Sequence, residues 1–175
     1  GEEWSSNPAM IAYWQKESPR YDNYKSYTPS MMDFPLQEAL VNSLLSKEIW
    51  ETSVKVLYNV LANDYLYGNP YDLVVFAGNH DMTRIFTQLK NDFDLYKMAM
   101  TYIFTTRGIP QVYYGTEILM KGPADHGTLR ADFPGGWSND KVNAFKGPGL
   151  KSEQKDAQSF TKKLLNWRKE SLPIT

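Results

Sequence analysis

The short apolar run Leu73–Phe76 is the feature that most limits how this chain can fold. An uninterrupted apolar run of this length predicts a strand, here over 72–76, that is buried on both faces of a parallel sheet. Asn79, His80 and Asp81 follow that strand almost directly. Because α/β barrels place their active sites at the carboxyl ends of their strands, we take these three polar residues as the first candidate site.

Composition narrows the classes of partner. The 175 residues are enough for one domain with a real core. A net charge of -1, with dispersed basic residues, argues against nucleic acid as a partner. The absence of cysteine excludes disulfides, thiol chemistry and cysteine zinc sites. No segment approaches the roughly 18 apolar residues of a membrane span, so we expect no membrane partner.

Aromatic residues make up 14% of the chain, with 12 tyrosines and 5 tryptophans. Several of them lie in a polar, loop-like stretch near the start, namely Tyr13, Trp14, Tyr21, Tyr24 and Tyr27. Their flat apolar faces and polar edges suit stacking on sugar rings or bases. Partial burial under long loops explains them equally well, and the sequence leaves both interpretations open.

The hydrophobic pattern predicts an alternation of strands and helices. The predicted elements are a loop over 5–30, a strand at 31–34, helices near 36–45 and 50–61, the strand at 72–76, a helix buried all round at 93–104, a strand at 112–114, a long loop at 116–150 and a last helix capped by Ser152, with Phe160, Leu164 and Trp167 on its apolar face. This order predicts parallel βαβ units. The long loops after the strands favour half of a closed barrel over a small doubly wound sheet.

Carboxylates gather at the predicted strand ends: Asp33, Asp81, Glu117 after Tyr113 and Tyr114, and the opening pair Glu2 and Glu3. A glycosidase needs at least two carboxyl groups in one cleft, of which one protonates the leaving oxygen and another stays ionised. A helix or turn cap is the alternative for Asp81, and a structural histidine is the alternative for His80. Neither His80 with Asp81 nor Asp125 with His126 has a third spaced ligand, so we expect no metal site.

Several segments in order resemble one family, the α-amylase superfamily or glycoside hydrolase family 13. Phe76–Arg84 resembles the signature after its seventh barrel strand, Gly108–Glu117 its eighth strand, Gly1–Trp4 the end of its fifth, Asp33–Pro35 its sixth, and Asn166–Lys169 with Leu172-Pro173 its closing helix. The neopullulanase and cyclomaltodextrinase group is the most similar. The resemblance implies a partial (β/α)8 TIM barrel with about strands 5 to 8, so that residues 1–175 form the C-terminal half of a catalytic barrel.

The resemblance also implies roles. Glu2 would be the general acid/base, and Asp81 would bind ring hydroxyls and stabilise the oxocarbenium-like transition state. His80 would donate a hydrogen bond to the same sugar, while Asn79 and Arg84 would support these groups. Tyr114 would contact substrate. Glu2 is chosen over Glu3 because it occupies the motif position, and because alternation along a strand lets only one of the two face the cleft.

The implied reaction is retaining hydrolysis of α-1,4-glucosidic bonds in starch, pullulan or cyclodextrin-like substrates. The family's nucleophilic aspartate has no counterpart here, so we expect a chain cut from a longer one, inactive alone and prone to self-association. We expect no cofactor, leave calcium open for an intact enzyme, and favour a periplasmic or extracellular location over a cytoplasmic one. The alternatives are a non-catalytic glycan-binding or assembly module and a related glucan transferase or isomerase.

Overall fold

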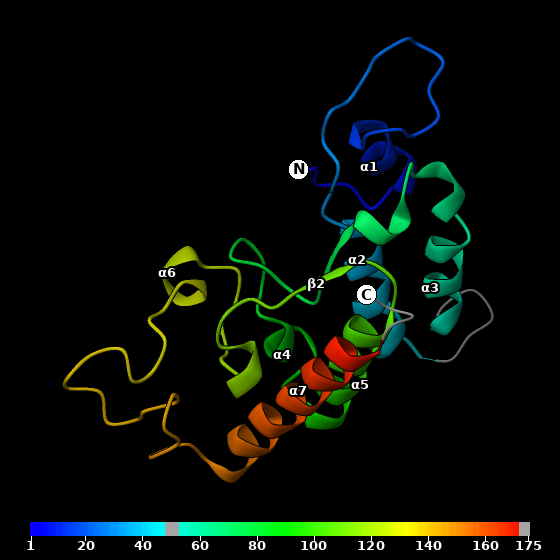
Figure 1. The fold of residues 1–175 in the computed structure, drawn as a ribbon. Coiled ribbons are helices and arrows are strands. Elements are labelled where there is room, and N and C mark those ends of the chain that lie inside the picture. Colours follow the sequence, from blue (N-terminus) through cyan, green and yellow to red (C-terminus); the bar gives the residue numbers. More distant parts are fainter. Residues whose placement is uncertain (48–52, 172–175) are drawn as a thin grey trace. The chain divides into compact units, whose positions relative to one another are not determined.

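The computed structural model describes residues 1–47 and 53–171 (Figure 1). The chain divides into two compact units, Gly1–Ala77 with Thr106–Gln111 and Gly78–Thr105 with Val112–Thr175. The first unit contains α1 (Pro8–Trp14), α2 (Phe34–Leu45), α3 (Val54–Leu61), the 3₁₀ helices η1 (Asp64–Leu66) and η2 (Pro70–Asp72), and strands β1 (Val74–Phe76) and β2 (Ile109–Gln111). The second contains α4 (Ile85–Gln88), α5 (Phe93–Thr105), η3 (Thr116–Ile118), α6 (His126–Leu129) and α7 (Ser152–Glu170).

Parallel pairing organises the first unit. β1 and β2 pair in parallel with Val74 opposite Ile109, and Met32 forms a parallel bridge with Val74. Gly1 continues the series, because its carbonyl accepts from the Met32 N–H at 2.9 Å and its amino group donates to the Ser30 carbonyl at 2.7 Å. Neighbours in the chain are therefore neighbours in the sheet, as in successive barrel strands. The parallel α/β prediction is confirmed, and the numbering as strands 5 to 8 stays a prediction.

In the apolar run Leu73–Phe76, the side chains of Leu73, Val75 and Phe76 are fully inaccessible and Val74 is half-buried. The strand itself begins only at Val74, because the Leu73 N–H closes η2 on the Pro70 carbonyl at 3.4 Å. The apolar pattern therefore located the centre of the sheet correctly and overestimated the strand by two residues.

Two other strand predictions are wrong, one in extent and one in position. The segment 31–34 contributes only the Met32 bridge, because the Asp33 carboxylate accepts from the Leu36 N–H at 3.1 Å and starts α2. The strand predicted at 112–114 lies instead at 109–111, where the Ile109 N–H donates to the Leu73 carbonyl at 2.7 Å.

Gly108 explains how closely β1 and β2 approach at this point. Its φ is +95°, and a Cβ atom there would lie 2.6 Å from the Leu73 carbonyl oxygen. Only glycine accommodates both the left-handed backbone and this contact.

The stretch 5–30, predicted as loop, contains α1. Asn7 caps that helix by accepting from the Ala9 N–H at 3.0 Å, and Pro8 fills its first position. Ile11 and Ala12 of α1 join a buried cluster with three later residues, Met31, Tyr67 and Leu73. The Asn-Pro pair was the available signal for this helix.

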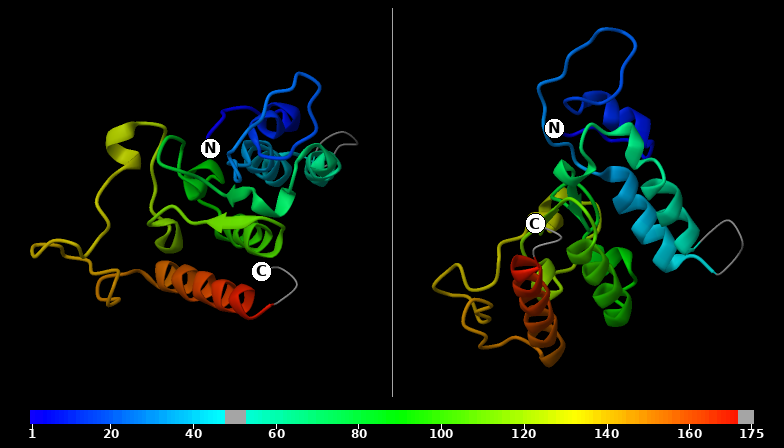
Figure 2. Two further views of the ribbon diagram at one scale, coloured as in Figure 1. Left: turned by 45° about the horizontal axis from the view of Figure 1, so that its top comes forward. Right: turned by 45° about the vertical axis from the view of Figure 1, so that its right-hand side comes forward.

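Helices α2 and α3 lie side by side in the first unit (Figures 1 and 2). The predicted helix at 36–45 is confirmed as α2, which begins two residues earlier, and the next predicted helix is confirmed over Val54–Leu61. Trp50, which the periodicity assigned to that helix, lies outside the described residues.

In the second unit α5 and α7 run next to each other (Figure 1). The buried helix predicted at 93–104 is confirmed as α5, with Tyr96, Ala99, Met100, Ile103 and Phe104 on its inner side. Its opposite side is exposed at Met98 and Thr101, so burial all round is wrong. No helix within residues 1–47 and 53–171 has the length and apolar character to cross a membrane.

The last helix buries a different face from the predicted one. Ala157, Thr161 and Arg168 are buried, whereas Trp167 is exposed and Phe160 half-buried. The Arg168 Nη1 donates to the Phe104 carbonyl at 2.9 Å, so an internal hydrogen bond replaces the expected apolar contact.

The start of α7 differs too. Lys151, not Ser152, is its N-cap, and the Lys151 N–H donates to the Gln154 side chain at 3.1 Å. At the other end, Leu172-Pro173 lies outside the described residues.

The predicted long loop at 116–150 is confirmed apart from the short η3 and α6, and it leads into α7 (Figure 2). Ile118, Ala144 and Leu150 form a small buried cluster inside it. Side-chain amides of α7 secure the same loop, because Gln154 donates to the Ile118 carbonyl and Gln158 to the Ala144 carbonyl, both at 3.0 Å.

Candidate active site

Asp81 is the centre of the candidate site in the second unit. It sits in a turn that directly follows β1 in the chain, where the Asn79 side-chain oxygen accepts from the Asp81 N–H at 2.9 Å. Asn79 itself is buried, and its Nδ2 has no hydrogen-bond partner among the described residues. Asn79 therefore shapes the turn that presents Asp81.

Nitrogen-bearing side chains surround the Asp81 carboxylate. Arg130 Nη2 donates to Oδ1, and His80 Nε2 lies 3.1 Å from Oδ2. His126 Nδ1 is 3.7 Å from Oδ1. The Asp81 side chain remains 29% exposed, and a carboxylate has about four acceptor positions, so these contacts leave room for hydroxyl donors.

Arg130 was missed from the sequence, and His126 was considered only as a metal ligand. Both belong to α6 or its C-terminal end, and Arg130 is 49 residues from Asp81 in the chain. Arg130 also donates from Nε to the His80 carbonyl at 3.3 Å. No local pattern predicts such a pairing, because it depends on how the long loop folds back.

Arg84 is buried and bonded to backbone. Its Nη1 donates to the Tyr114 carbonyl and its Nη2 to the Leu129 carbonyl, each at 2.7 Å. Its own N–H donates to the Gly122 carbonyl at 3.0 Å. Arg84 thus ties the turn after Asp81 to the loop after Tyr114, and a direct contact with substrate stays a prediction.

Tyr113 and Tyr114 stand next to this arginine. Their rings meet edge to face at 4.6 Å, with the Arg84 guanidinium 4.7 Å and 5.1 Å from the two centroids. Their hydroxyls donate to the Leu129 and Ala131 carbonyls at 3.1 Å and 2.8 Å. Burial, followed by interaction with Tyr114, raises the pKa of Tyr113 to about 12, so it is a neutral phenol at working pH.

Glu2 lies in the first unit. It is exposed, and its Oε1 accepts from the Trp4 indole N–H at 2.8 Å. Residues 1–5 have no strand assignment, so the argument from alternation for Glu2 over Glu3 is wrong, and the choice rests on the motif position alone.

Asp33, a strand-end candidate in the sequence, belongs instead to a buried ionic cluster of the first unit. Arg107 Nη1 donates to Asp33 Oδ2 at 2.7 Å, and Arg107 Nε donates to Asp64 Oδ2 at 2.7 Å. Burial raises the pKa of Asp33, which Arg107 opposes. Burial also lowers the pKa of Arg107, but its hydrogen bonds to Asp64 and the charge of Asp33 raise it overall. Asp33 is therefore structural, and Arg107 was missed in the sequence.

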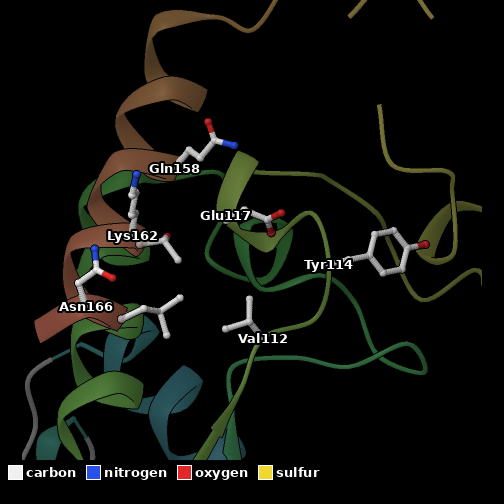
Figure 3. Close-up of a pocket in the computed structure, with 8 residues that line it drawn as sticks. Val112, Tyr114, Glu117, Gln158, Lys162 and Asn166 are labelled. Atoms are coloured by element: carbon white, nitrogen blue, oxygen red, sulfur yellow. The ribbon is translucent and has the colours of Figure 1, made fainter. Parts of the chain in front are cut away.

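A pocket of about 410 Å³ lies between η3 and α7 (Figure 3). Gln158, Lys162 and Asn166 reach it from α7, and Glu117 enters from η3. Glu117 was a strand-end carboxylate candidate in the sequence, and Tyr114, a predicted substrate contact, lies at the pocket's margin. Burial raises the pKa of Glu117, whose Oε2 has no partner within the described part of the chain.

Metal ligands are not grouped in the part of the chain that the structure covers. Over residues 1–47 and 53–171, no three histidine or acidic side chains lie close enough together to hold an ion.

Comparisons with known proteins identify the relatives of this arrangement. A family model described as the catalytic domain of α-amylases matches residues 1–171. A cyclomaltodextrin glucanotransferase of Niallia circulans is 34% identical over 96 residues, covering 55% of this chain and 13% of that protein. A cyclomaltodextrinase of Thermoanaerobacter pseudethanolicus is 27% identical over 164 residues, covering 90% of this chain and 25% of that protein.

Among solved structures, an α-amylase from Geobacillus thermoleovorans in complex with acarbose matches with a TM-score of 0.69 and 32% identity. The match covers 98% of this chain and 33% of that protein. The chain thus spans a third or less of each of these relatives.

Proposed function

Because this chain belongs to the α-amylase catalytic-domain family, we propose that it supplies the general acid/base and the transition-state stabiliser of a retaining α-glucan hydrolase. Its substrates would be α-1,4-linked glucans such as starch, pullulan or cyclodextrins. The observation that carries the proposal is the surroundings of Asp81: a partly exposed carboxylate beside His80, on a turn fixed by Asn79.

In the proposed reaction, the Glu2 carboxylic acid donates its proton to the glycosidic oxygen as the bond between that oxygen and the anomeric carbon breaks. The electron pair of the bond leaves with the oxygen, and positive charge develops on the sugar ring. Asp81 accepts hydrogen bonds from ring hydroxyls and stabilises that charge, while His80 donates to the same sugar. The anomeric carbon forms a bond to a nucleophilic carboxylate that lies outside this chain. Glu2, now a carboxylate, then takes a proton from the water that attacks the same carbon, and the bond to the nucleophile breaks to release the sugar.

The nucleophile is assigned outside these 175 residues. A retaining mechanism needs a second carboxylate about 5–5.5 Å from the acid, and Asp33, Asp125 and Asp132 do not sit in the motif of the family nucleophile. Asp33 is moreover fully buried and held by Arg107. We therefore expect no turnover by the isolated chain and normal turnover by a longer natural polypeptide that contains it.

The test is hydrolysis of starch, pullulan and cyclodextrins by the longest natural polypeptide that contains this chain. Asp81→Asn should lower kcat by about 10²–10³, as expected for loss of an electrostatic stabiliser. The matched control is Asp156→Asn on the exposed side of α7, which should leave kcat unchanged. Equal activity of the Asp81→Asn and Asp156→Asn proteins would refute the role of Asp81.

A glucan transferase is the second candidate, favoured by the similarity to a cyclomaltodextrin glucanotransferase. Both reactions use the same acid and stabiliser and differ in whether water or a sugar hydroxyl takes the glycosyl group. Product analysis with maltoheptaose separates them, because only transfer yields products longer than the substrate.

A further inference from the structure

Three aromatic side chains of the first unit gather where α1 ends: Tyr13 and Trp14 are the last two residues of that helix, and Tyr24 lies on the segment that follows it. They are here called the aromatic platform. The Tyr13 and Tyr24 rings stack with centroids 5.5 Å apart and planes 10° apart. Trp14 meets both rings edge-on, at 4.9 Å and 6.0 Å. Each of the three is between 36% and 43% exposed.

Polar contacts hold the platform in place. The Tyr13 hydroxyl donates to Asp22 Oδ2 at 2.8 Å, and Asp22 Oδ1 accepts from the Tyr24 N–H at 3.0 Å. The Arg20 guanidinium lies 5.7 Å and 5.5 Å from the Tyr13 and Tyr24 centroids, and its Nε donates to the Tyr13 carbonyl at 2.8 Å. The rings are thus ordered before any ligand arrives, which lowers the entropy lost on binding.

The platform is not a core fragment. A core cluster would bury its side chains, as Ile11 and Ala12 of the same helix are buried. Here the rings stay open to solvent, and Tyr21, in the same segment, is fully exposed. An exposed aromatic patch with charged groups at its edge indicates a surface for a ligand with an apolar face and many hydroxyls.

We propose that the aromatic platform binds an α-glucan chain, in addition to the sugar contacts proposed for Asp81. The C–H face of a glucosyl ring stacks on exposed tyrosine or tryptophan surface, and its hydroxyls bond to Asp22 and Arg20. This choice of ligand rests on the proposed function. A net charge of -1 argues against a nucleic acid on these rings.

The test is mobility in native gels that contain amylopectin, using the same polypeptide as in the activity assays. Trp14→Ala and Tyr24→Ala should each weaken retardation about tenfold, as for loss of one aromatic contact. Tyr24→Phe keeps the ring and should be retarded normally. The matched control, Tyr65→Ala, removes a tyrosine that is 75% exposed in the same unit and should have no effect.

Far-UV circular dichroism and the thermal midpoint confirm that each variant is folded, and Tyr21→Ala adds a change at a fully exposed ring that cannot disturb packing. Folded Trp14→Ala and Tyr24→Ala proteins that are retarded like the parent would overturn the platform.

Asp81→Asn separates the two proposals. The platform predicts that this variant is still retarded. If retardation depends on Asp81 alone, the proposal that the platform binds glucan is wrong, and the proposed role of Asp81 is retained. If the platform variants lose retardation and the parent hydrolyses no glucan, the proposed function fails and the platform stands.

Discussion

The Arg130 guanidinium donates a hydrogen bond to the Asp81 carboxylate and a second one to the His80 carbonyl. One side chain from the long loop thereby fixes both proposed sugar-binding groups. Since the pair is partly exposed, its value to stability is small, about 0–1 kcal/mol. We expect the Arg130–Asp81 contact to matter for the orientation of the Asp81 carboxylate and not for stability.

Arg130→Gln should therefore lower kcat/KM on maltoheptaose by about tenfold, because Asp81 loses its orienting partner. The thermal midpoint should stay within about 2 °C of the parent. His126 lies 3.7 Å from the same carboxylate without a hydrogen bond, so His126→Gln serves as the milder comparison. Unchanged kinetics in Arg130→Gln would show that the contact has no part in positioning.

The Arg107 cluster predicts a large loss of stability. Arg107→Met leaves Asp33 and Asp64 without their shared cation, and removal of one member of a buried ion pair costs about 3–5 kcal/mol. Lys16→Met breaks only the exposed pair with Glu17 and should change the free energy of unfolding by at most about 1 kcal/mol. Urea denaturation measures both; similar values for the two variants would contradict a structural role for Arg107.

Gly108 and Gly147 offer a matched test of strand pairing. Both have positive φ, +95° and +91°, but a Cβ at Gly108 meets the Leu73 carbonyl whereas nothing lies within 4 Å at Gly147. Gly147→Ala should cost about 1 kcal/mol for backbone strain, and Gly108→Ala should cost more because β1 and β2 must separate. Equal losses in urea denaturation would mean that the close approach is absent in solution.

The raised pKa of Glu117 predicts that the contribution of this residue to stability depends on pH. Its folded-state pKa is raised by burial, so its contribution to stability is present below the ordinary carboxyl range and is lost as pH rises through the folded-state value. Glu117→Gln should therefore stabilise the protein at pH 7 by on the order of 1 kcal/mol and have little effect below about pH 4. Glu38→Gln, at an exposed position of α2, should show no such dependence. A Glu117→Gln protein that is less stable at pH 7 would refute this account.

The hydrophobic pattern of the sequence predicted correctly those strands and helices whose burial is encoded in their own residues. The run Leu73–Phe76 located the central strand, and the spacing in 93–104 located α5, because burial of these segments is encoded in their own composition. The strand at 112–114 was misplaced since its register depends on Gly108 approaching Leu73, a contact between distant segments.

The residues of the candidate site likewise include some that the sequence identified and one that it did not. Asp81, His80 and Asn79 were identified from their position behind a buried strand, and the structure places them together in one turn. Arg130 could not be found, because it reaches Asp81 only after the loop 116–150 folds back. The convergence of Glu2 with Asp81 rests on the family resemblance, and their roles stay predictions until measured.

The most direct test of these roles compares two substrates with different leaving groups in the longest natural polypeptide that contains this chain. α-Maltosyl fluoride needs little protonation to leave, whereas maltoheptaose needs a general acid. Glu2→Gln should lower kcat/KM for maltoheptaose by about 10²–10⁴ and spare the fluoride, while Asp81→Asn should impair both and Glu3→Gln neither. Equal losses on the two substrates in Glu2→Gln, or none, would contradict the assignment of Glu2 as acid and Asp81 as stabiliser.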